Sequence, residues 1–292
     1  VIYKIWILYF IRTRCENIKP KAILSFNERY NNIVLLSLLG TKIKTFVSDR
    51  NNPHMDIGKI HHFLRNKLYR NCSGIIAQTE IAKNELDFNT QNKNIKVIPN
   101  PLREIITKNN FINTKKIILN TGRNVPQKNQ LELLEIFSQC SYKDWQLIIL
   151  GSGPLHQELI VKTRELNLQN NVQILNFSHE VDTFYAEAKI FAFTSLYEGF
   201  PNALIEAMAH GLPCVSYDCP TGPKDIINNN VNGYLVPLFD KQKFVEKLSD
   251  LMKNEELRSV FSIESKKVNQ LYSLDKISEK YYNFIMKDET NY

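Results

Sequence analysis

The sequence has few of the features that mark small secreted or metal-stapled proteins. Its five cysteines are spread over 292 residues without a CxxC pair, which excludes a disulfide scaffold and a zinc ribbon and is typical of a reducing compartment. There is no internal repeat and no low-complexity tract. With 43% hydrophobic and 23% charged residues, the chain has a globular composition rather than a disordered or collagen-like one.

A long hydrophobic run is also missing. The apolar stretch over residues 1–11 is about half of the ~20 residues that a membrane-spanning helix needs, and Lys4 interrupts it. The basic residues Arg12 and Arg14 follow in place of the small-residue cleavage site of a signal peptide. We expect a buried or amphipathic helix here. Because the chain begins with Val1 rather than Met, we also expect it to be a fragment.

Negative charge is scarce in one half of the chain only. The whole chain has 37 Lys and Arg against 30 Asp and Glu, a formal net charge of +7. Residues 1–110 hold 18 of the basic and 8 of the acidic side chains. A basic half is typical of proteins that meet an anionic membrane, phosphorylated substrates or nucleic acid, and a solvated surface is an equally good interpretation. Nucleic acid is the least favoured partner, because no motif interleaves aromatic and basic residues.

Short apolar, β-branched runs alternate with segments of helical length. The runs are continuous rather than alternating, which is typical of strands covered on both faces, and strand–helix–strand repetition indicates parallel sheets. The predicted strands are Ala22–Phe26, Lys44–Ser48, Gly74–Gln78, Lys96–Ile98, Ile117–Leu119, Gln146–Leu150, Val172–Leu175, Ile190–Phe193, Pro213–Ser216 and Gly233–Val236. The clearest predicted helices are Asn129–Cys140, Gly153–Leu166, Asn202–His210 and Asp240–Lys253.

Length and punctuation together predict two domains. At roughly 150 residues per domain the chain is long enough for two cores. The break falls between Pro99 and Asn113, where two prolines and an Asn-rich stretch precede a new strand. We therefore expect a first domain over residues 1–108, a second over 109–275 and a terminal segment over 276–292. The first domain has only four predicted strands, so we expect it to be incomplete.

Loops that follow strands of the second domain carry residues suited to phosphate, since open α/β sheets bind ligands at the carboxyl ends of their strands. In the loop 120–129, Gly122 allows a tight turn, and Arg123 and Lys128 place two cations at one strand end. Two cations can hold a diphosphate without a metal; a solvated turn before a helix is the alternative. Gly151–Pro154 favours a structural turn, although a helix start also attracts anions. Neither a P-loop GK[ST] nor a complete GxGxxG occurs.

A third loop, at residues 195–209, is the most informative. Its carboxylates Glu198 and Glu206 can both approach the start of a helix, because helical side chains lean toward the N-terminus. Backbone N–H groups at residues 202–204 are suited to hold an anion there. A sugar nucleotide needs this combination of donors for a diphosphate and acidic acceptors for hydroxyl groups. The alternative is a helix whose first turns carry acids that complement its dipole.

These residues resemble a known family. Glu198 and Glu206, with seven residues between them, together with Gly122, Arg123, Lys128 and the segment 151–154, resemble the retaining glycosyltransferases of family 4. Residues 218–236 look like the late donor-site segment of that family and residues 97–101 like its inter-domain linker. The resemblance covers about residues 20–285. It implies the α/β GT-B fold, in which two Rossmann-like, doubly wound domains face a cleft; here the first would lack its opening strand and Gly-rich loop.

The resemblance also implies roles for individual residues. Arg123 and Lys128 would neutralise the leaving diphosphate, Glu198 would stabilise the donor sugar in the transition state, and Glu206 would hold the ribose hydroxyls. Phe177 would bracket the base. No metal and no cofactor other than the donor substrate is implied, since no DxD-type acidic pair lies beside the site. The other implied donor-site residues are Gly122, Gly199, Phe200, Asn202, Ala203 and Leu204.

The expected reaction moves a hexose or N-acetylhexosamine from a UDP-sugar to a glycan or a polyprenyl-diphosphate-linked acceptor, in synthesis of cell-surface polysaccharide such as capsule, O-antigen or lipopolysaccharide. The preference for UDP is implied by the loop 220–223, which resembles that of family members that use UDP-hexose or UDP-N-acetylhexosamine. We expect a cytoplasmic protein, peripheral on the inner face of the plasma membrane, whose basic half meets anionic lipid. Ile277–Met286 would cross back to the first domain. A sugar-nucleotide epimerase or phosphorylase on the same fold, and a truncated chain that binds nucleotide without turnover, are the alternatives.

Other candidates are weaker. His54, His61 and His62 follow a strand end and are a poor prospect for a metal site, although His54 is suited to lie near the sugar. Cys214 and Cys219 are expected to be ordinary thiols.

Overall fold

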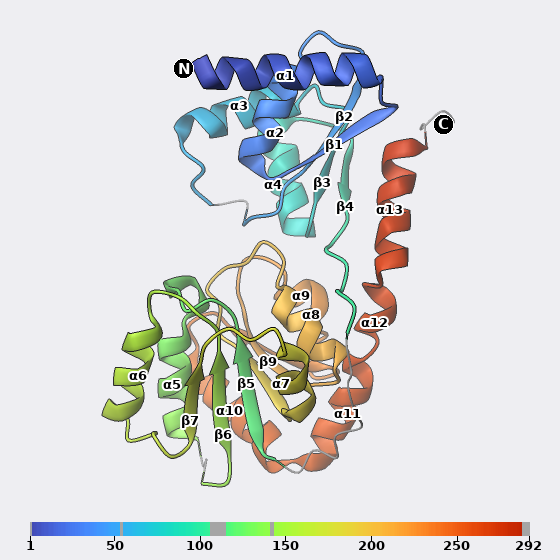
Figure 1. The fold of residues 1–292 in the computed structure, drawn as a ribbon. Helices are drawn as coiled ribbons and strands as arrows, with labels where there is room; N and C mark the ends of the chain where they lie inside the picture. Colours follow the sequence, from blue (N-terminus) through green and yellow to red (C-terminus); the bar gives the residue numbers. More distant parts are fainter. Residues whose placement is uncertain (1, 53–54, 106–114, 141–142, 288–292) are drawn as a thin grey trace. The chain divides into compact units, whose positions relative to one another are not determined.

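The structure is a computed structural model that describes all residues except 1, 53–54, 106–114, 141–142 and 288–292 (Figure 1). His54 lies outside the described residues. The chain forms two compact units, Val1–Pro101 with Leu274–Tyr292, and Leu102–Ser273. The division falls after residue 101 rather than after 108 because Leu102 is already tied to the second unit: its N–H donates to the carbonyl of Tyr272 over 2.7 Å, and both side chains belong to one core.

The first unit is a four-stranded parallel sheet with strand order β1-β2-β3-β4 (Figure 1). Strand β3 is the most apolar and is buried along its whole length, as expected of a central strand covered on both faces. Its elements are α1 (Ile2–Ile18), β1 (Ala22–Phe26), α2 (Glu28–Ser37), β2 (Lys44–Ser48), α3 (Lys59–Tyr69), β3 (Gly74–Ala77), α4 (Glu80–Thr90), β4 (Ile95–Val97) and α13 (Leu274–Met286).

The terminal helix α13 packs on the sheet of the first unit. Ile277 is buried in a small core with Ile76 and Ile98, and the ring of Phe284 meets that of Phe46 edge-on at 5.4 Å. Helix α1, by contrast, is not buried. Ile5 is 61% exposed, and Trp6, Tyr9 and Phe10 are exposed as well, so, of the two alternatives expected for this helix, buried or amphipathic, the buried one is wrong for this face. The described residues include no helix long and apolar enough to cross a membrane.

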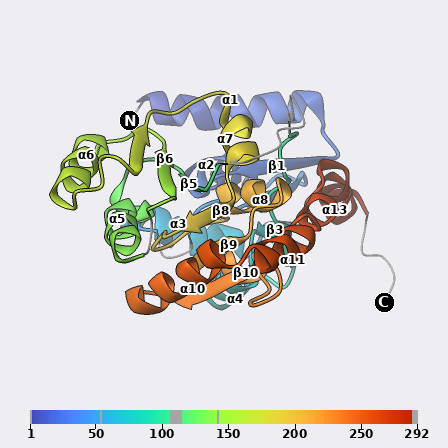
Figure 2. The ribbon, with the colours of Figure 1, turned by 90° about the horizontal axis from the view of Figure 1, so that it is seen from below.

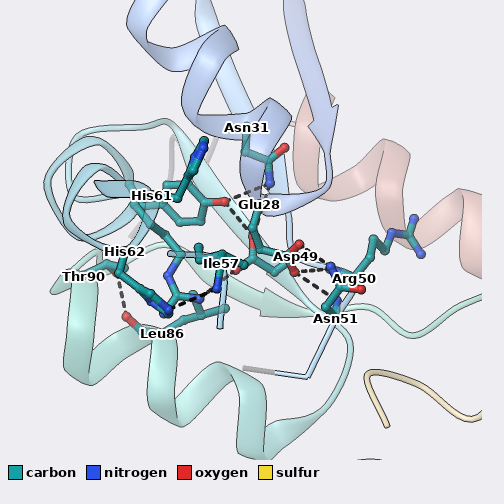
Figure 3. A network of polar contacts seen from close by, with 12 residues as sticks. Glu28, Asn31, Asp49, Arg50, Asn51, Ile57, His61, His62, Leu86 and Thr90 are labelled. Atoms are coloured by element: carbon teal, nitrogen blue, oxygen red, sulfur yellow. Dashed lines mark hydrogen bonds and ion pairs between the residues drawn. The ribbon is translucent and has the colours of Figure 1, made fainter. Parts of the chain in front are cut away.

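A buried carboxylate organises the loop that follows β2. Glu28 is 3% exposed and accepts three hydrogen bonds from that loop (Figure 3). The backbone N–H groups of Arg50 and Asn51 donate to it over 3.0 and 2.9 Å, and the side-chain amide of Asn51 donates over 2.6 Å. Since a buried carboxylate is costly unless it is satisfied, these bonds fix the loop against the first turn of α2. The side-chain amide of Asn32 donates to the backbone carbonyl of His61 over 3.0 Å, and the Ile57 N–H donates to Nε2 of His62 over 3.4 Å.

A second carboxylate lies next to the first. Asp49 accepts from the Tyr69 hydroxyl over 2.6 Å and from the Asn31 amide over 3.2 Å (Figure 3). Arg65 lies 3.8 Å from its other oxygen. Burial is the largest cause that raises the pKa of Asp49 to about 7, and the nearby charge of Glu28 raises it further. The first unit therefore contains a buried carboxyl group that changes its charge near neutral pH.

The second unit is a six-stranded parallel sheet of order β10-β9-β8-β5-β6-β7. Read from β7, this is the 3-2-1-4-5-6 order of a doubly wound domain, in which the chain reverses direction across the sheet between its first and fourth strands. The strands are β5 (Ile117–Thr121), β6 (Gln146–Leu150), β7 (Val172–Leu175), β8 (Ile190–Phe193), β9 (Cys214–Asp218) and β10 (Gly233–Pro237). The helices are a 3-10 turn (Pro126–Lys128), α5 (Gln130–Gln139), α6 (His156–Glu165), α7 (Val181–Glu187), α8 (Asn202–Ala209), α9 (Pro223–Ile226), α10 (Lys241–Lys253), α11 (Glu255–Ser265) and α12 (Val268–Leu271).

This sheet is covered on both faces, as its continuous apolar strands predict. Alternate strand residues such as Ile118 and Ile149 belong to a core with α5, α6 and α10. Their neighbours Leu119 and Ile148 belong to a second core with α7 and α8. Figure 2 shows α7 and α8 on one side of β8–β10 and α10 on the other. The two cores hold the strand ends rigidly, and the loops that follow those ends carry the candidate site.

Five predicted strands, including Gln146–Leu150 and Ile190–Phe193, have the observed bounds, and the others differ by one or two residues at one or both ends. The largest shifts at a helix start are in α13, which begins at Leu274 rather than Ile277, and in α6, which begins at His156 rather than Gly153. Residues 153–155 form a turn there, with the His156 N–H donating to the Gly153 carbonyl over 3.2 Å.

Candidate functional site

The second unit contains a cavity of about 700 Å³ at the carboxyl ends of β5, β6 and β7. It therefore lies beside the point where the strand order reverses, which is where open α/β sheets bind their ligands. Its described lining residues are Arg103, Thr121, Gly122, Arg123, Leu150, Gly151, Ser152, Phe177, Ser178, His179, Val181, Tyr185, Ala203 and Glu206. Five of the predicted donor-site residues are among them: Gly122, Arg123, Phe177, Ala203 and Glu206.

Two glycines bring the walls of the cavity together. A Cβ atom on Gly151 would lie 1.8 Å from the carbonyl oxygen of Gly122, and one on Gly153 would lie 2.4 Å from that of Asn124. The Asn124 amide also donates to the Gly151 carbonyl over 3.0 Å. The segment 151–154 is thus a structural turn, and its backbone at Gly151 and Ser152 also lines the cavity.

Glu206 reaches the cavity from the second turn of α8 and is held at both oxygens. Its Oε1 lies 3.3 Å from Arg103 Nε, and its Oε2 accepts from the Tyr185 hydroxyl over 3.3 Å. The Tyr185 hydroxyl also lies 2.8 Å from Thr121 Oγ1, at the end of β5. Burial raises the pKa of Glu206, and Arg103 and Tyr185 act against that shift. A carboxylate held in this way is an oriented acceptor for hydroxyl groups.

Arg103 is a lining residue that sequence analysis missed. Its guanidinium makes two hydrogen bonds to Asp182, of 3.0 and 2.5 Å, in addition to the contact with Glu206. Asp182 is also 3.1 Å from Nε2 of His210, at the end of α8. No local motif marks Arg103 or Asp182, because 79 residues separate them. The only signal in the sequence is that Arg103 lies in the predicted break between the domains, two residues after the linker segment 97–101.

Lys128 and Glu198, predicted to act on the diphosphate and the sugar, form an ion pair with Nζ and Oε1 2.6 Å apart. Both are largely buried, and Lys128 also lies over the ring of Phe193 at 5.3 Å. The loop after β9 holds Glu198 in place: its N–H donates to the Pro220 carbonyl over 2.9 Å, and the Thr221 hydroxyl donates to its carbonyl over 2.7 Å. The pair is separate from the described lining of the cavity, which Arg123 reaches without Lys128.

The remaining predicted residues divide into surface and core. Phe177 is 64% exposed at the cavity and meets the ring of His179 edge-on at 5.0 Å. Phe200 and Leu204 are buried in the core beneath α8, so their side chains pack rather than line the cavity.

The N–H groups of Asn202 and Leu204 donate to the carbonyls of residues 200 and 201 over 3.0 Å. The carbonyl of Gly199 accepts from the Thr221 hydroxyl over 3.0 Å. The helix start at α8 thus uses donors that the sequence suggested for an anion.

Among the residues that the structure describes, no group of three or more His, Cys, Asp or Glu side chains is arranged to hold a metal ion. All five cysteines are free, and Cys214 and Cys219 are buried.

Solved structures share this architecture. Staphylococcus aureus TarM, crystallised with UDP, superposes with a TM-score of 0.80 at 22% identity, over 95% of this chain and 58% of TarM. Anabaena HepE in complex with UDP superposes with a TM-score of 0.82 at 16% identity, over 94% of this chain and 80% of HepE. The two parallel-sheet, Rossmann-like domains define the GT-B fold.

Residues 103–268 match the family described as glycosyl transferases group 1, and the chain belongs to that family. The amylovoran biosynthesis glycosyltransferase AmsD of Erwinia amylovora is 32% identical over 194 residues, which are 64% of this chain and 55% of AmsD. A Campylobacter jejuni N-acetylgalactosaminyltransferase that acts on a diphospho-undecaprenol-linked sugar is 25% identical over 93% of this chain and 78% of its own length. The chain spans 55% to 62% of the length of three curated relatives that it matches at 30% identity or more.

Proposed function

We propose that this protein is a retaining glycosyltransferase of family 4 that binds a nucleoside diphosphate sugar in the 700 Å³ cavity of the second unit. The observation that carries the proposal is the presence of Arg123 and Glu206 on the wall of one cavity, at the strand-order reversal of a group 1 glycosyltransferase chain. Arg123 supplies a cation for a diphosphate, and Glu206 supplies an acceptor for the ribose hydroxyls.

The donor is proposed to be a UDP-sugar carrying a hexose or an N-acetylhexosamine. TarM and HepE, which share the fold, were each crystallised with UDP, and two relatives are named as N-acetylgalactosaminyl and galactosyl transferases. The exposed ring of Phe177 at the cavity offers an apolar face to stack on the uracil base, as aromatic side chains do with bases.

Lys128 and Glu198 are proposed to act at the bond that breaks. The leaving diphosphate gains negative charge in the transition state, which a nearby ammonium stabilises. Lys128 is held 2.6 Å from Glu198, so its charge is positioned before the donor arrives. Glu198 stabilises the positive charge that develops on the sugar. In this proposal the cationic side chains neutralise the diphosphate in place of a metal ion, and no cofactor other than the donor is needed.

The acceptor is proposed to be a glycan or a polyprenyl-diphosphate-linked sugar, used in synthesis of cell-surface polysaccharide. This follows the named activities of relatives in amylovoran, lipopolysaccharide and undecaprenol-linked glycan synthesis. The basic character of residues 1–110 supports a peripheral position on the inner, cytoplasmic face of the plasma membrane, where anionic lipid attracts Lys and Arg with about 1 kcal/mol each.

Calorimetric titration with UDP, GDP and ADP tests the donor site, followed by transfer assays with the matching sugars and lipid-linked acceptors. UDP should bind most tightly, and Glu206→Ala and Lys128→Ala should weaken binding and abolish transfer. Unchanged UDP affinity in both variants would contradict the site. Isomerised donor in the absence of acceptor would favour the epimerase alternative, phosphate-dependent cleavage a phosphorylase, and UDP binding without transfer or donor hydrolysis a chain that only binds nucleotide.

A further inference from the structure

The carboxylate of Glu206 is backed by a chain of polar groups that no motif of the sequence predicts. Arg103 Nε lies 3.3 Å from Glu206 Oε1, and the other two nitrogens of the same guanidinium bond to both oxygens of Asp182, over 3.0 and 2.5 Å. Behind Asp182 lies His210 Nε2, at 3.1 Å, with its side chain 3% exposed. The ring of His210 stacks on that of Tyr185 at 5.2 Å.

The two hydrogen bonds to Asp182 orient the guanidinium of Arg103, and Arg103 in turn orients Glu206. A guanidinium offers five N–H donors in a rigid fork, so a bidentate bond to one carboxylate leaves Nε directed at a second. The side chain of Asp182 is 13% exposed and that of Arg103 36%, so the anchoring carboxylate is the more buried partner. A lysine at this position has one ammonium and cannot keep both contacts in the same geometry.

The charged side chains around Glu206 affect the pKa of its carboxyl group. Glu206 is largely buried, and burial raises its pKa, whereas Arg103 and the Tyr185 hydroxyl lower it. Asp182 acts in the opposite sense, through its own negative charge. Burial lowers the pKa of His210, which favours its neutral form, and Asp182 opposes that shift. Arg123 and His179 are the other ionisable side chains among the described lining residues. Arg103 is thus the cation in contact with the Glu206 carboxylate.

We propose that Arg103, fixed by Asp182, is a positioning residue for the nucleoside part of the donor: it holds the Glu206 carboxylate in place and ionised so that it accepts hydrogen bonds from the ribose hydroxyls. The inference rests on the proposed function, because it takes Glu206 as the ribose acceptor. Arg103 acts through Glu206 and makes no bond to the sugar that is transferred. Loss of Arg103 therefore changes donor affinity and its pH dependence more than the rate of transfer at saturating donor.

The test is UDP binding by the full chain across about pH 5.5 to 8.5, because burial raises the pKa of Glu206 and Arg103 opposes that shift. Because the terminal phosphate of UDP itself takes up a proton near pH 6, the readout is the affinity of each variant relative to wild type at the same pH. Arg103→Gln should bind about tenfold more weakly, with the greater loss at the acid end. Arg103→Lys should recover part of the affinity. Arg164→Gln, on the exposed face of α6, is the matched control and should behave as wild type.

A double-mutant cycle with Glu206→Gln separates this inference from the proposed function. If Arg103 acts through Glu206, then Arg103→Gln causes no further loss of UDP affinity in the Glu206→Gln background. An equal loss in both backgrounds, or an unchanged pH profile in Arg103→Gln, would overturn the positioning role and leave the donor site standing. Wild-type affinity in Glu206→Gln alone would instead contradict the ribose role in the proposed function.

A variant of Asp182 tests the contact that anchors Arg103, and thermal unfolding serves as the control for an intact fold. Asp182→Asn keeps the size of the side chain but removes the charge that anchors Arg103, so it should weaken UDP binding in the same direction as Arg103→Gln and by less. Thermal unfolding of each variant reports whether the fold is intact. If Asp182→Asn is stable and binds UDP as wild type does at every pH, the anchoring part of the proposal is wrong.

Discussion

Lys128 Nζ and Glu198 Oε1 lie 2.6 Å apart although 70 residues separate the two positions. Their side chains are 14% and 9% exposed, and a buried pair of opposite charges is costly to break because the remaining partner loses both water and its counter-ion. The pair thus brings together two side chains from separate loops, to which the proposed function assigns the diphosphate and the sugar.

Breaking this pair should cost stability as well as activity. Lys128→Ala leaves Glu198 buried without its partner, and we expect the free energy of unfolding to fall by up to about 3 kcal/mol. The double variant Lys128→Met with Glu198→Gln removes both charges and should recover most of that stability. Urea unfolding measures the first effect, and transfer assays should show no activity in either protein. Sugar transfer by the double variant would mean that the pair is structural only.

Adding one methyl group at Gly151 should close the site. The Cβ atom of Gly151→Ala would lie 1.8 Å from the Gly122 carbonyl oxygen, so the two loops must separate. We expect UDP affinity to fall more than tenfold and stability to fall by about 2 kcal/mol or more. Gly40→Ala is the control, because nothing lies within 4 Å of its Cβ. It should cost about 1 kcal/mol, from its positive φ alone, and leave UDP binding unchanged.

The first unit should lose stability as the pH rises toward neutrality. The pKa of Asp49 is raised to about 7 in the folded state from an ordinary 3.8. The folded state therefore binds the proton more tightly, so the stabilisation is complete below the ordinary pKa and is lost between about pH 4 and 7, with a slope of at most about 1.4 kcal/mol per pH unit. In urea unfolding, Asp49→Asn should remove the pH dependence of the free energy of unfolding across this range. Asp87→Asn, on the exposed surface of α4, should keep that pH dependence. A slope that persists in Asp49→Asn would assign the effect to another group.

We predict that helix α3 takes part in the proposed contact with an anionic membrane. Ile60 and Phe63 are 74% and 62% exposed on it, and the neighbouring Lys59 and Lys67 are exposed as well. Exposed apolar side chains flanked by lysines are typical of interfacial helices. The double variant Ile60→Ser with Phe63→Ser should bind vesicles containing phosphatidylglycerol several-fold more weakly in co-sedimentation. Phe88→Ser, 85% exposed on α4, is the matched control. Vesicle binding that changes neither with salt concentration nor with the content of anionic lipid would contradict a membrane role for the basic half.

Much of the fold could be predicted because its signals are local. Continuous apolar runs marked strands such as Gln146–Leu150 to the residue, since burial on both faces of a parallel sheet leaves no room for polar side chains. Glu198 and Glu206 could likewise be recognised from the sequence, because both lie in one continuous segment of a loop and the helix that follows it.

The walls of the cavity could not be predicted in this way, because they depend on which strands are neighbours. The order β10-β9-β8-β5-β6-β7 brings Arg103 to Asp182 and Glu206, and brings Lys128 to Glu198, across separations that no periodicity records. The same packing buries Phe200 and Leu204 in the core, although their sequence neighbours suggested a binding role. The sequence by itself determined the strands, the basic half and the acidic pair. Only tertiary structure decided which charges meet, because contacts between distant residues depend on how the sheet is assembled.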